Sequence, residues 1–183
     1  MIQQIVNMSA ANLATLLERT VEQPIIDAME SKRFLLMECS QITPLIYLLY
    51  HVLYTNYQSV GIFYENEATT VSIFSFLKGE YSLLPNWAKH KIVSENKHVM
   101  SFENGSRIEC RSISSQAMRG RSYNVIYIDE FASFPEERIN HFMESVFPVI
   151  SYSKTTRVFI RKVWSQAGCK LQNNPLWSYI DHK

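Results

Sequence analysis

Cysteine is scarce in this chain, which argues against both a disulfide framework and a cysteine-based metal site. Cys39, Cys110 and Cys169 are widely spaced and form no Cys-x-x-Cys pair. We therefore expect free thiols in a reducing compartment and no structural zinc. No two histidines have a metal-ligand spacing such as His-x-x-x-His, so structural or surface roles are expected for every histidine of the chain. The histidines are His51, His90, His98, His141 and His182.

Neither sign of charge dominates, and no apolar run is long enough to cross a membrane. The formal net charge is +1 at pH 7, which excludes a global attraction to nucleic acid or membrane, so any DNA contact must come from a local patch. The most apolar stretch, 45–54, is interrupted by His51 and falls short of the about 20 residues of a span. It predicts a core helix. Residues 1–10 lack the basic start and apolar core of a signal peptide.

The features that are present indicate one α/β domain. A length of 183 residues and a hydrophobic content of 46% fit a single domain with a real core. Short apolar runs alternate with helical patterns, an order that predicts a mainly parallel sheet with right-handed crossovers, flanked by helices. Helices are expected at 10–19, 24–31, 44–54, 67–78, 136–146 and 174–180, and strands at 34–37, 58–64, 99–102, 107–111, 125–128 and 156–163.

A β-hairpin is expected near residues 98–111. Glu103-Asn104-Gly105-Ser106 separates two alternating runs there. Asparagine and glycine both tolerate the positive φ that a tight hairpin turn requires. The segment 83–90 before the hairpin is expected to be irregular.

The strand at 125–128 ends in two carboxylates. Its continuous, mostly β-branched apolar run is typical of a strand buried on both faces of a parallel sheet. Asp129 and Glu130 follow at the carboxyl end, where α/β proteins place ligands. This is the Walker B pattern of NTPases, in which the Asp holds Mg²⁺ and the Glu polarises the attacking water. The alternative is a buried strand that happens to end in acidic, solvated residues.

Together with two further motifs, this strand makes the chain resemble the N-terminal ATPase domain of phage large terminase subunits of the T4-like branch. The other motifs are the hairpin residues 103–106 and the run 115–123, Ser-Gln-Ala-Met-Arg-Gly-Arg-Ser-Tyr. The resemblance extends from about residue 22 to residue 168. It implies a RecA-like, P-loop NTPase-type sheet of the additional-strand, catalytic-glutamate class, with residues 1–183 as a single ATPase domain that stops before the nuclease domain.

The resemblance also implies an activity and site residues. The family translocates duplex DNA into a procapsid, in the host cell cytoplasm, with ATP and Mg²⁺. Asp129 matches the metal-holding carboxylate and Glu130 the catalytic one, while Gln23 falls where the family contacts the adenine. Arg119 matches an arginine finger supplied to a neighbouring subunit, and Arg121 has a weaker claim. The alternative for Arg119 is a solvated loop arginine.

The expected phosphate-binding loop departs from the family pattern. The family reads Ser-Arg-Gln-x-Gly-Lys-Thr, whereas residues 39–45 read Cys-Ser-Gln-Ile-Thr-Pro-Leu. Thr43 adds bulk at the glycine position, and Pro44 removes both the lysine charge and a backbone N–H. The lost lysine bond alone is worth about 1.5–3 kcal/mol, and Leu45 cannot bind Mg²⁺. Nucleotide binding is therefore expected to be weak or absent.

Some positions that face the nucleotide in this family remain polar. The candidate cofactor-binding residues are Gln23, Ser40, Gln41, Thr43 and Asp129. In the family, a threonine-rich segment that senses the γ-phosphate follows the last strand. Here two cations, Arg161 and Lys162, stand there. With Trp164 and Lys170 they would form a small basic-aromatic patch for a phosphate backbone, or else an ordinary charged surface.

Two functional hypotheses follow. In the first, the chain is a terminase-like protein of viral DNA packaging that is defective in ATP hydrolysis. It acts by contact with terminase subunits or portal, or by self-association, and reaches DNA only through the motor, without a membrane. In the second, it is a divergent ATPase whose phosphate contacts are completed by a partner chain. A simple nucleic-acid-binding module is a third possibility.

Overall fold

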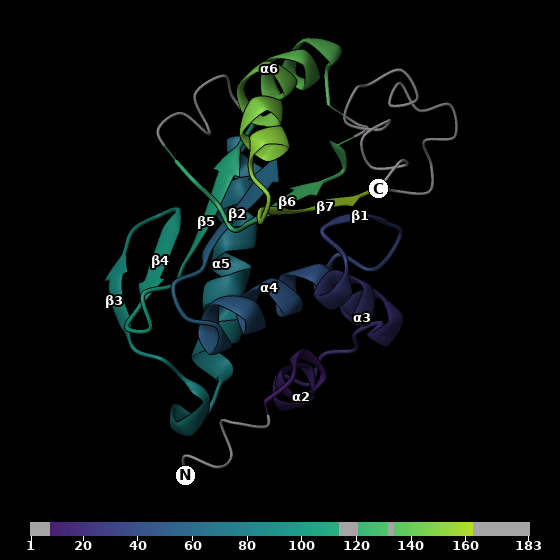
Figure 1. Ribbon diagram of the computed structural model, residues 1–183. Coiled ribbons are helices and arrows are strands. Elements are labelled where there is room, and N and C mark those ends of the chain that lie inside the picture. The colour runs from purple at the N-terminus through teal and green to yellow at the C-terminus, as the bar shows by residue number, and fades with distance from the viewer. Residues whose placement is uncertain (1–7, 114–120, 132–133, 163–183) are drawn as a thin grey trace.

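The computed structural model describes residues 8–113, 121–131 and 134–162 (Figure 1). Its helices are α2 (Ala10–Leu16), α3 (Gln23–Ser31), α4 (Ile42–Tyr54), α5 (Glu67–Leu83) and α6 (Glu136–Tyr152), with a 3-10 turn at Asn86–Ala88. Its strands are β1 (Phe34–Met37), β2 (Ser59–Tyr64), β3 (Ile92–Glu95), β4 (Val99–Phe102), β5 (Arg107–Ser112), β6 (Val125–Asp129) and β7 (Arg157–Arg161). Within the described ranges, no helix has the length and apolar character to cross a membrane.

The seven strands form one sheet in the order β1-β7-β6-β2-β5-β4-β3. Neighbouring strands are parallel from β1 to β5, while β4 and β3 add to the edge in antiparallel pairing. The predicted mainly parallel α/β sheet is confirmed. The last strand in sequence, β7, lies between β1 and β6, and this insertion is the additional strand that the family resemblance implied.

The predicted hairpin is confirmed by the antiparallel pairing of β4 with β5. Gly105 has φ +77° in the turn, and a Cβ there would come within 2.5 Å of the Tyr57 ring. Asn104 holds the turn against the end of α4, because its side-chain amide donates to the carbonyls of Val52 at 2.8 Å and Leu53 at 3.0 Å. The Asn-Gly pair is thus required both by backbone conformation and by its contacts.

Helices α2–α5 lie on one face of the sheet and helix α6 lies on the other (Figure 1). Val125 and Tyr127 of β6 belong to the core that includes buried residues of α2–α5, whereas Ile126 and Ile128 belong to a second core with residues of α6. Alternate residues of one strand therefore enter different cores, as expected of a strand buried on both sides. The continuous apolar run at the start of β6 is explained by this position.

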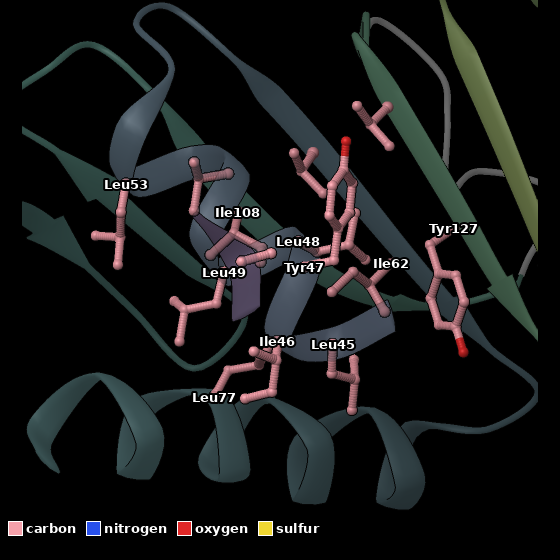
Figure 2. Close-up of a cluster of buried hydrophobic side chains, with 14 of the residues drawn as sticks. Leu45, Ile46, Tyr47, Leu48, Leu49, Leu53, Ile62, Leu77, Ile108 and Tyr127 are labelled. Atoms are coloured by element: carbon pink, nitrogen blue, oxygen red, sulfur yellow. The ribbon is translucent and has the colours of Figure 1, made fainter. Parts of the chain in front are cut away.

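The most apolar helix, α4, lies within the larger core. Its side chains from Leu45 to Leu49 are at most 2% exposed, and Figure 2 shows them clustered with Ile62 of β2, Leu77 of α5 and Tyr127 of β6. This burial confirms the predicted core helix. Full burial of such side chains stabilises the fold by roughly 1.5–3 kcal/mol each relative to exposure.

The sequence-based prediction missed β3 and misjudged some boundaries. Strand β3 is a short, mostly exposed edge strand whose two apolar residues, Ile92 and Val93, are adjacent, and Val93 is 60% exposed, so it lacks the alternating apolar pattern on which strand prediction depends. The segment 83–90, expected to be irregular, contains a 3-10 turn. Helix α2 ends at Leu16 rather than near residue 19, and Glu18 beyond it has φ 53°. The helix predicted at 174–180 lies outside the described residues.

Candidate functional site

The carboxyl ends of β1, β7 and β6 bring together the side chains of the candidate site. Parallel pairing sets Asp129 of β6 opposite Arg161 of β7, which is in turn opposite Met37 of β1. Arg161 Nε donates to Asp129 Oδ1 at 2.6 Å, and Gln41 Nε2 donates to Asp129 Oδ2. Both oxygens of Asp129 therefore accept hydrogen bonds from side chains of the chain itself.

Asp129 is not a solvated carboxylate. Its side chain is fully buried, which contradicts the expectation that an acidic residue at the end of a strand faces water. Burying an ionised carboxylate is costly unless a cation and hydrogen bonds compensate for it. Arg161 and Gln41 supply this compensation.

The guanidinium of Arg161 contacts three groups at once. Besides Asp129, its Nη2 donates to Glu130 Oε1 at 3.1 Å and its Nη1 donates to the Cys39 carbonyl oxygen at 3.4 Å. Burial by itself lowers the pKa of Arg161, but the hydrogen bond and the charge of Asp129 outweigh it and raise the pKa overall. The side chain therefore stays a cation at the centre of the site.

This position changes the interpretation of the predicted basic-aromatic patch. The Arg161 side chain is only 10% exposed, so it does not contribute to a basic surface. Lys162 forms an ion pair with Glu38 at the end of β1. Trp164 and Lys170 lie outside the described residues, and the patch is not supported by the two cations that are described.

Glu130 begins the segment that follows β6. Its φ of 52° is uncommon for a residue other than glycine and is a feature that recurs at functional sites. Its N–H donates to the Arg161 carbonyl oxygen at 2.9 Å, and its side chain is 49% exposed. Glu130 therefore touches Arg161 while remaining accessible from outside.

The loop between β1 and α4 is engaged by a carboxylate that the sequence analysis did not identify. The Ser40 N–H donates to Glu22 Oε1 at 2.7 Å, and the Glu22 N–H donates to Thr43 Oγ1 at 3.2 Å. Thr43 is fully buried, and Pro44 and Leu45 are also buried. The loop thus binds a carboxylate of the same chain. Ser40 and Thr43, which were predicted to bind the nucleotide, both contact Glu22 instead.

Two further groups complete the inner part of the site. The hydroxyl of Tyr64 lies 3.3 Å from Gln41 Nε2, and burial followed by the charge of Asp129 raises the pKa of Tyr64. Burial, then the charge of Glu22, raises the pKa of the Cys39 thiol to about 12, so this thiol is not an activated nucleophile. Within the described ranges, no group of three or more His, Cys, Asp and Glu side chains is placed to hold a metal.

The other predicted site residues lie outside this cluster. Gln23 is exposed on α3, and its amide donates to Asp27 Oδ1 at 2.6 Å. Arg119 lies outside the described residues. Arg121 pairs with Glu109, with Nε 3.1 Å from Oε1, and the side chain of Glu109 is only 3% exposed.

Of the predicted residues, the structure therefore brings Gln41, Asp129 and Glu130 together. It places Ser40 and Thr43 in the adjoining loop. The contributions of Arg161 and Glu22 were missed. The only sequence feature that pointed to Arg161 was the presence of two cations where the family has a threonine-rich segment. No sequence feature pointed to Glu22.

Comparisons with known proteins agree with this architecture. Residues 43–161 match the family described as "Terminase large subunit, T4likevirus-type, N-terminal". A mutant form of the large terminase ATPase domain of a Thermus phage superposes with a TM-score of 0.64 at 14% identity, over 84% of this chain and 69% of that one. Another structure of the same Thermus phage domain gives 0.59 at 12% identity, over 81% of this chain and 67% of that one.

The large terminase of bacteriophage HK97 is a longer relative in fold. Its TM-score is 0.60 at 10% identity, and the match covers 84% of this chain but only 37% of the HK97 protein. Identities this low show a shared fold alone. The family match, in contrast, covers more than half of the 183 residues, and the chain therefore belongs to the terminase large subunit family of the T4-like-virus type, in its N-terminal region.

Proposed function

We propose that this protein takes part in phage DNA packaging as an ATPase-domain homologue that does not hydrolyse ATP and acts through protein contacts. Its site of action would be the cytoplasm of the infected cell. The observation that carries the proposal is the buried ion pair in which Arg161 Nε lies 2.6 Å from Asp129 Oδ1. It places a cation of the chain on the carboxylate that would hold Mg²⁺.

The residues present do not fit a metal-bound nucleotide. The related Thermus phage structures are ATPase domains, so the family implies ATP and Mg²⁺. A metal on Asp129 would have to displace Arg161, whose side chain is 10% exposed. Breaking a buried ion pair by removing one partner costs about 3–5 kcal/mol, which opposes binding before any phosphate contact is made.

The loop after β1 adds two obstacles to phosphate binding. Pro44 and Leu45 stand at the lysine and threonine positions, and both side chains are buried in the first turn of α4. The backbone N–H of Ser40 already donates to the Glu22 carboxylate, which would repel a phosphate. Losing a charge-assisted bond of about 1.5–3 kcal/mol corresponds to roughly one to two decades of affinity.

The divergent ATPase remains the alternative because Gln41, Asp129 and Glu130 still meet at the carboxyl end of the sheet. Glu130 is half-exposed, as a residue that polarises an attacking water must be. In that case a partner chain would supply the phosphate contacts, and Arg161 would have to leave Asp129 when nucleotide binds. The two hypotheses differ in what the isolated protein does with Mg·ATP.

Calorimetric titration with Mg·ATP is expected to show no binding with a dissociation constant in the low micromolar range or below. Such a constant corresponds to a binding free energy of about −8 kcal/mol or a more negative value. The physical reason is the combined loss of the lysine, the metal-binding hydroxyl and an accessible Asp129. A competent large terminase ATPase domain serves as the positive control. Tight binding, together with ATP turnover that Glu130→Gln abolishes, would replace the proposal with the divergent ATPase.

The protein is also expected to form a complex at micromolar concentration. A subunit that keeps the fold but lacks the phosphate-binding residues can still occupy a place among competent subunits or present Arg119 to a neighbour. Light scattering tests self-association, and pull-down tests full-length large terminase and portal protein. Arg119→Ala is expected to weaken any effect on a partner's ATPase while leaving the circular dichroism spectrum unchanged. A strict monomer that binds neither partner, nor DNA, would contradict the proposal.

A further inference from the structure

Asn104 is the one asparagine of the chain that a glycine follows. In an unconstrained chain such a pair is chemically unstable, because glycine has no Cβ to hinder the approach of its nitrogen to the asparagine side chain. The Gly105 nitrogen loses its proton and attacks Asn104 Cγ, the new C–N bond closes a succinimide ring, and Nδ2 leaves as ammonia. Water then opens the ring to aspartate or, where the chain continues through the side chain, to isoaspartate.

In the folded protein, hydrogen bonds hold both reacting groups. The Gly105 N–H donates to the Phe102 carbonyl oxygen at 3.0 Å. The Asn104 amide is fixed at both ends, because Nδ2 donates to two carbonyls at the end of α4, at 2.8 Å and 3.0 Å, and Oδ1 accepts from the Ser106 N–H at 3.0 Å. Cγ cannot turn toward the attacking nitrogen, nor can Nδ2 leave, while these bonds persist. Cyclisation therefore requires the turn to open first.

The carbonyls that Asn104 satisfies lie at the carboxyl end of α4. Val52 and Leu53 belong to its last turn, where carbonyls have no partner further along the helix, and the Thr55 carbonyl lies 3.5 Å from the same Nδ2. Deamidation replaces this donor by a carboxylate oxygen, which can only accept. A negative charge is also unfavourable at the C-terminus of a helix. Isoaspartate in addition lengthens the backbone of the turn, so the folded turn accommodates neither product.

Asn96, in the connection between β3 and β4, has the opposite arrangement. Its Oδ1 accepts from the backbone N–H groups of His98 at 2.8 Å and Val99 at 3.0 Å. A carboxylate accepts the same bonds, so aspartate can replace asparagine at this position. Asn104 is needed as a donor and Asn96 as an acceptor, and a damaging effect of deamidation is therefore specific to Asn104.

We propose that Asn104 is a deamidation site which the folded turn protects, and that deamidation of an opened molecule prevents the turn between β4 and β5 from closing again. Protection depends on contacts with the end of α4, which is distant in sequence, so Asn104 stays unprotected until these two segments meet. A molecule that remains open for long loses its native state permanently. This inference concerns the covalent stability of the chain and does not depend on a role in packaging.

Peptide mass spectrometry after incubation at mildly alkaline pH tests the protection, with samples in native buffer and in guanidinium chloride above the unfolding midpoint. Isoaspartate is expected at Asn104 in the denaturant, where the other asparagines stay largely intact, and to be nearly absent from Asn104 in buffer. In the denaturant, Gly105→Ala should slow the reaction strongly, because the added Cβ hinders the approach of the nitrogen. An undiminished rate would contradict the succinimide route.

The rate in native buffer should depend on how firmly the turn is closed. Ser106→Ala is expected to raise it, because the Ser106 hydroxyl donates to the Thr55 carbonyl oxygen at 2.6 Å and holds the turn against the end of α4. Ser94→Ala is the matched control, since Ser94 is exposed on β3 and its replacement should leave the rate unchanged. Equal rates for the two variants would contradict gating by opening of the turn.

Thermal unfolding tests the consequence of deamidation. Asn104→Asp is expected to lower Tm by about 10 °C, because it leaves the Val52 and Leu53 carbonyls without their donor and places a charge opposite them. Asn96→Asp is the matched control and is expected to shift Tm by no more than about 2 °C.

Wild-type protein aged in guanidinium chloride provides a second test if Asn104→Asp fails to fold. After dilution, the fraction that recovers the native circular dichroism spectrum should fall as the deamidated fraction at Asn104 rises, and the refolded material should contain intact Asn104. The inference is overturned if Asn104 deamidates as fast in buffer as in denaturant, or if deamidated chains regain the wild-type Tm. Tight Mg·ATP binding would instead contradict the proposed function, so the two failures are distinguishable.

Discussion

Asp129→Ala is expected to lower the free energy of unfolding by about 3–5 kcal/mol, because it leaves the Arg161 guanidinium buried without its main counter-ion. The Asp129 side chain is 0% exposed and the Arg161 side chain 10% exposed, and Arg161 Nε lies 2.6 Å from Asp129 Oδ1. Glu130 still contacts Arg161 at 3.1 Å and compensates part of its charge. Urea denaturation followed by circular dichroism measures the change.

Asp27→Ala is the matched control for this measurement. Asp27 is an exposed carboxylate on α3 whose Oδ1 accepts from Gln23 Nε2 at 2.6 Å. Exposed polar contacts of this kind contribute at most about 1 kcal/mol, so the control should remain close to wild type. An equally small effect of Asp129→Ala would show that Asp129 is solvated after all.

The retention of this ion pair is informative because burial of charge is an inefficient source of stability. Well-packed hydrophobic replacements of buried ion pairs are often neutral or stabilising. The pair between Asp129 and Arg161 therefore contributes to the arrangement of the site more than to net stability. It fixes the ends of β6 and β7 against the loop that carries Cys39, whose carbonyl accepts from the same guanidinium at 3.4 Å.

The fold was largely predictable because its main elements have strong local patterns. The buried run of β6, the Asn104-Gly105 turn and the apolar helix α4 each carry a periodicity or turn signal that the structure confirms. Strand β3 has no such signal, since this short, mostly exposed edge strand forms through pairing with β4 rather than through an alternating apolar face.

The site was only partly predictable because its contacts depend on strand register. Asp129 and Glu130 follow from the end of one strand, but the pairing of Asp129 with Arg161 needs the parallel alignment of β6 with β7, which local sequence does not specify. Charged side chains are usually exposed, so Arg161 was assigned to a surface patch. Glu22 approaches the loop through the fold of α3 beside α4, which no spacing in the sequence indicates.

A second charged residue of β7 leads to a pH-dependent prediction. Nη2 of Arg157 lies 3.0 Å from Nε2 of His51, and Oε1 of Gln58 lies 3.1 Å from the same ring nitrogen. His51 is 8% exposed and its ring stacks on Tyr47 at 6.0 Å between centroids. Burial, and then the charge of Arg157, lowers the pKa of His51 from 6.5 to about 4, although the contact with Gln58 acts in the opposite direction.

The free energy of unfolding is therefore expected to fall between pH 6.5 and about pH 4. Above pH 6.5 His51 is neutral in both states, and its contribution is fully present. Below that pH the unfolded chain binds a proton that the folded protein excludes, so stability decreases by about 1.4 kcal/mol per pH unit. The total loss from this group reaches about 3 kcal/mol near pH 4.

Urea denaturation of wild type and His51→Gln across this range isolates the contribution of His51. The variant cannot be protonated, so the difference between the two stability profiles should change by about 3 kcal/mol between pH 7 and pH 4. His141→Gln is the matched control, because His141 is 56% exposed on α6 and should keep the wild-type profile. Parallel profiles for wild type and His51→Gln would show that the ring is protonated equally in both states, and that Arg157 does not hold it neutral.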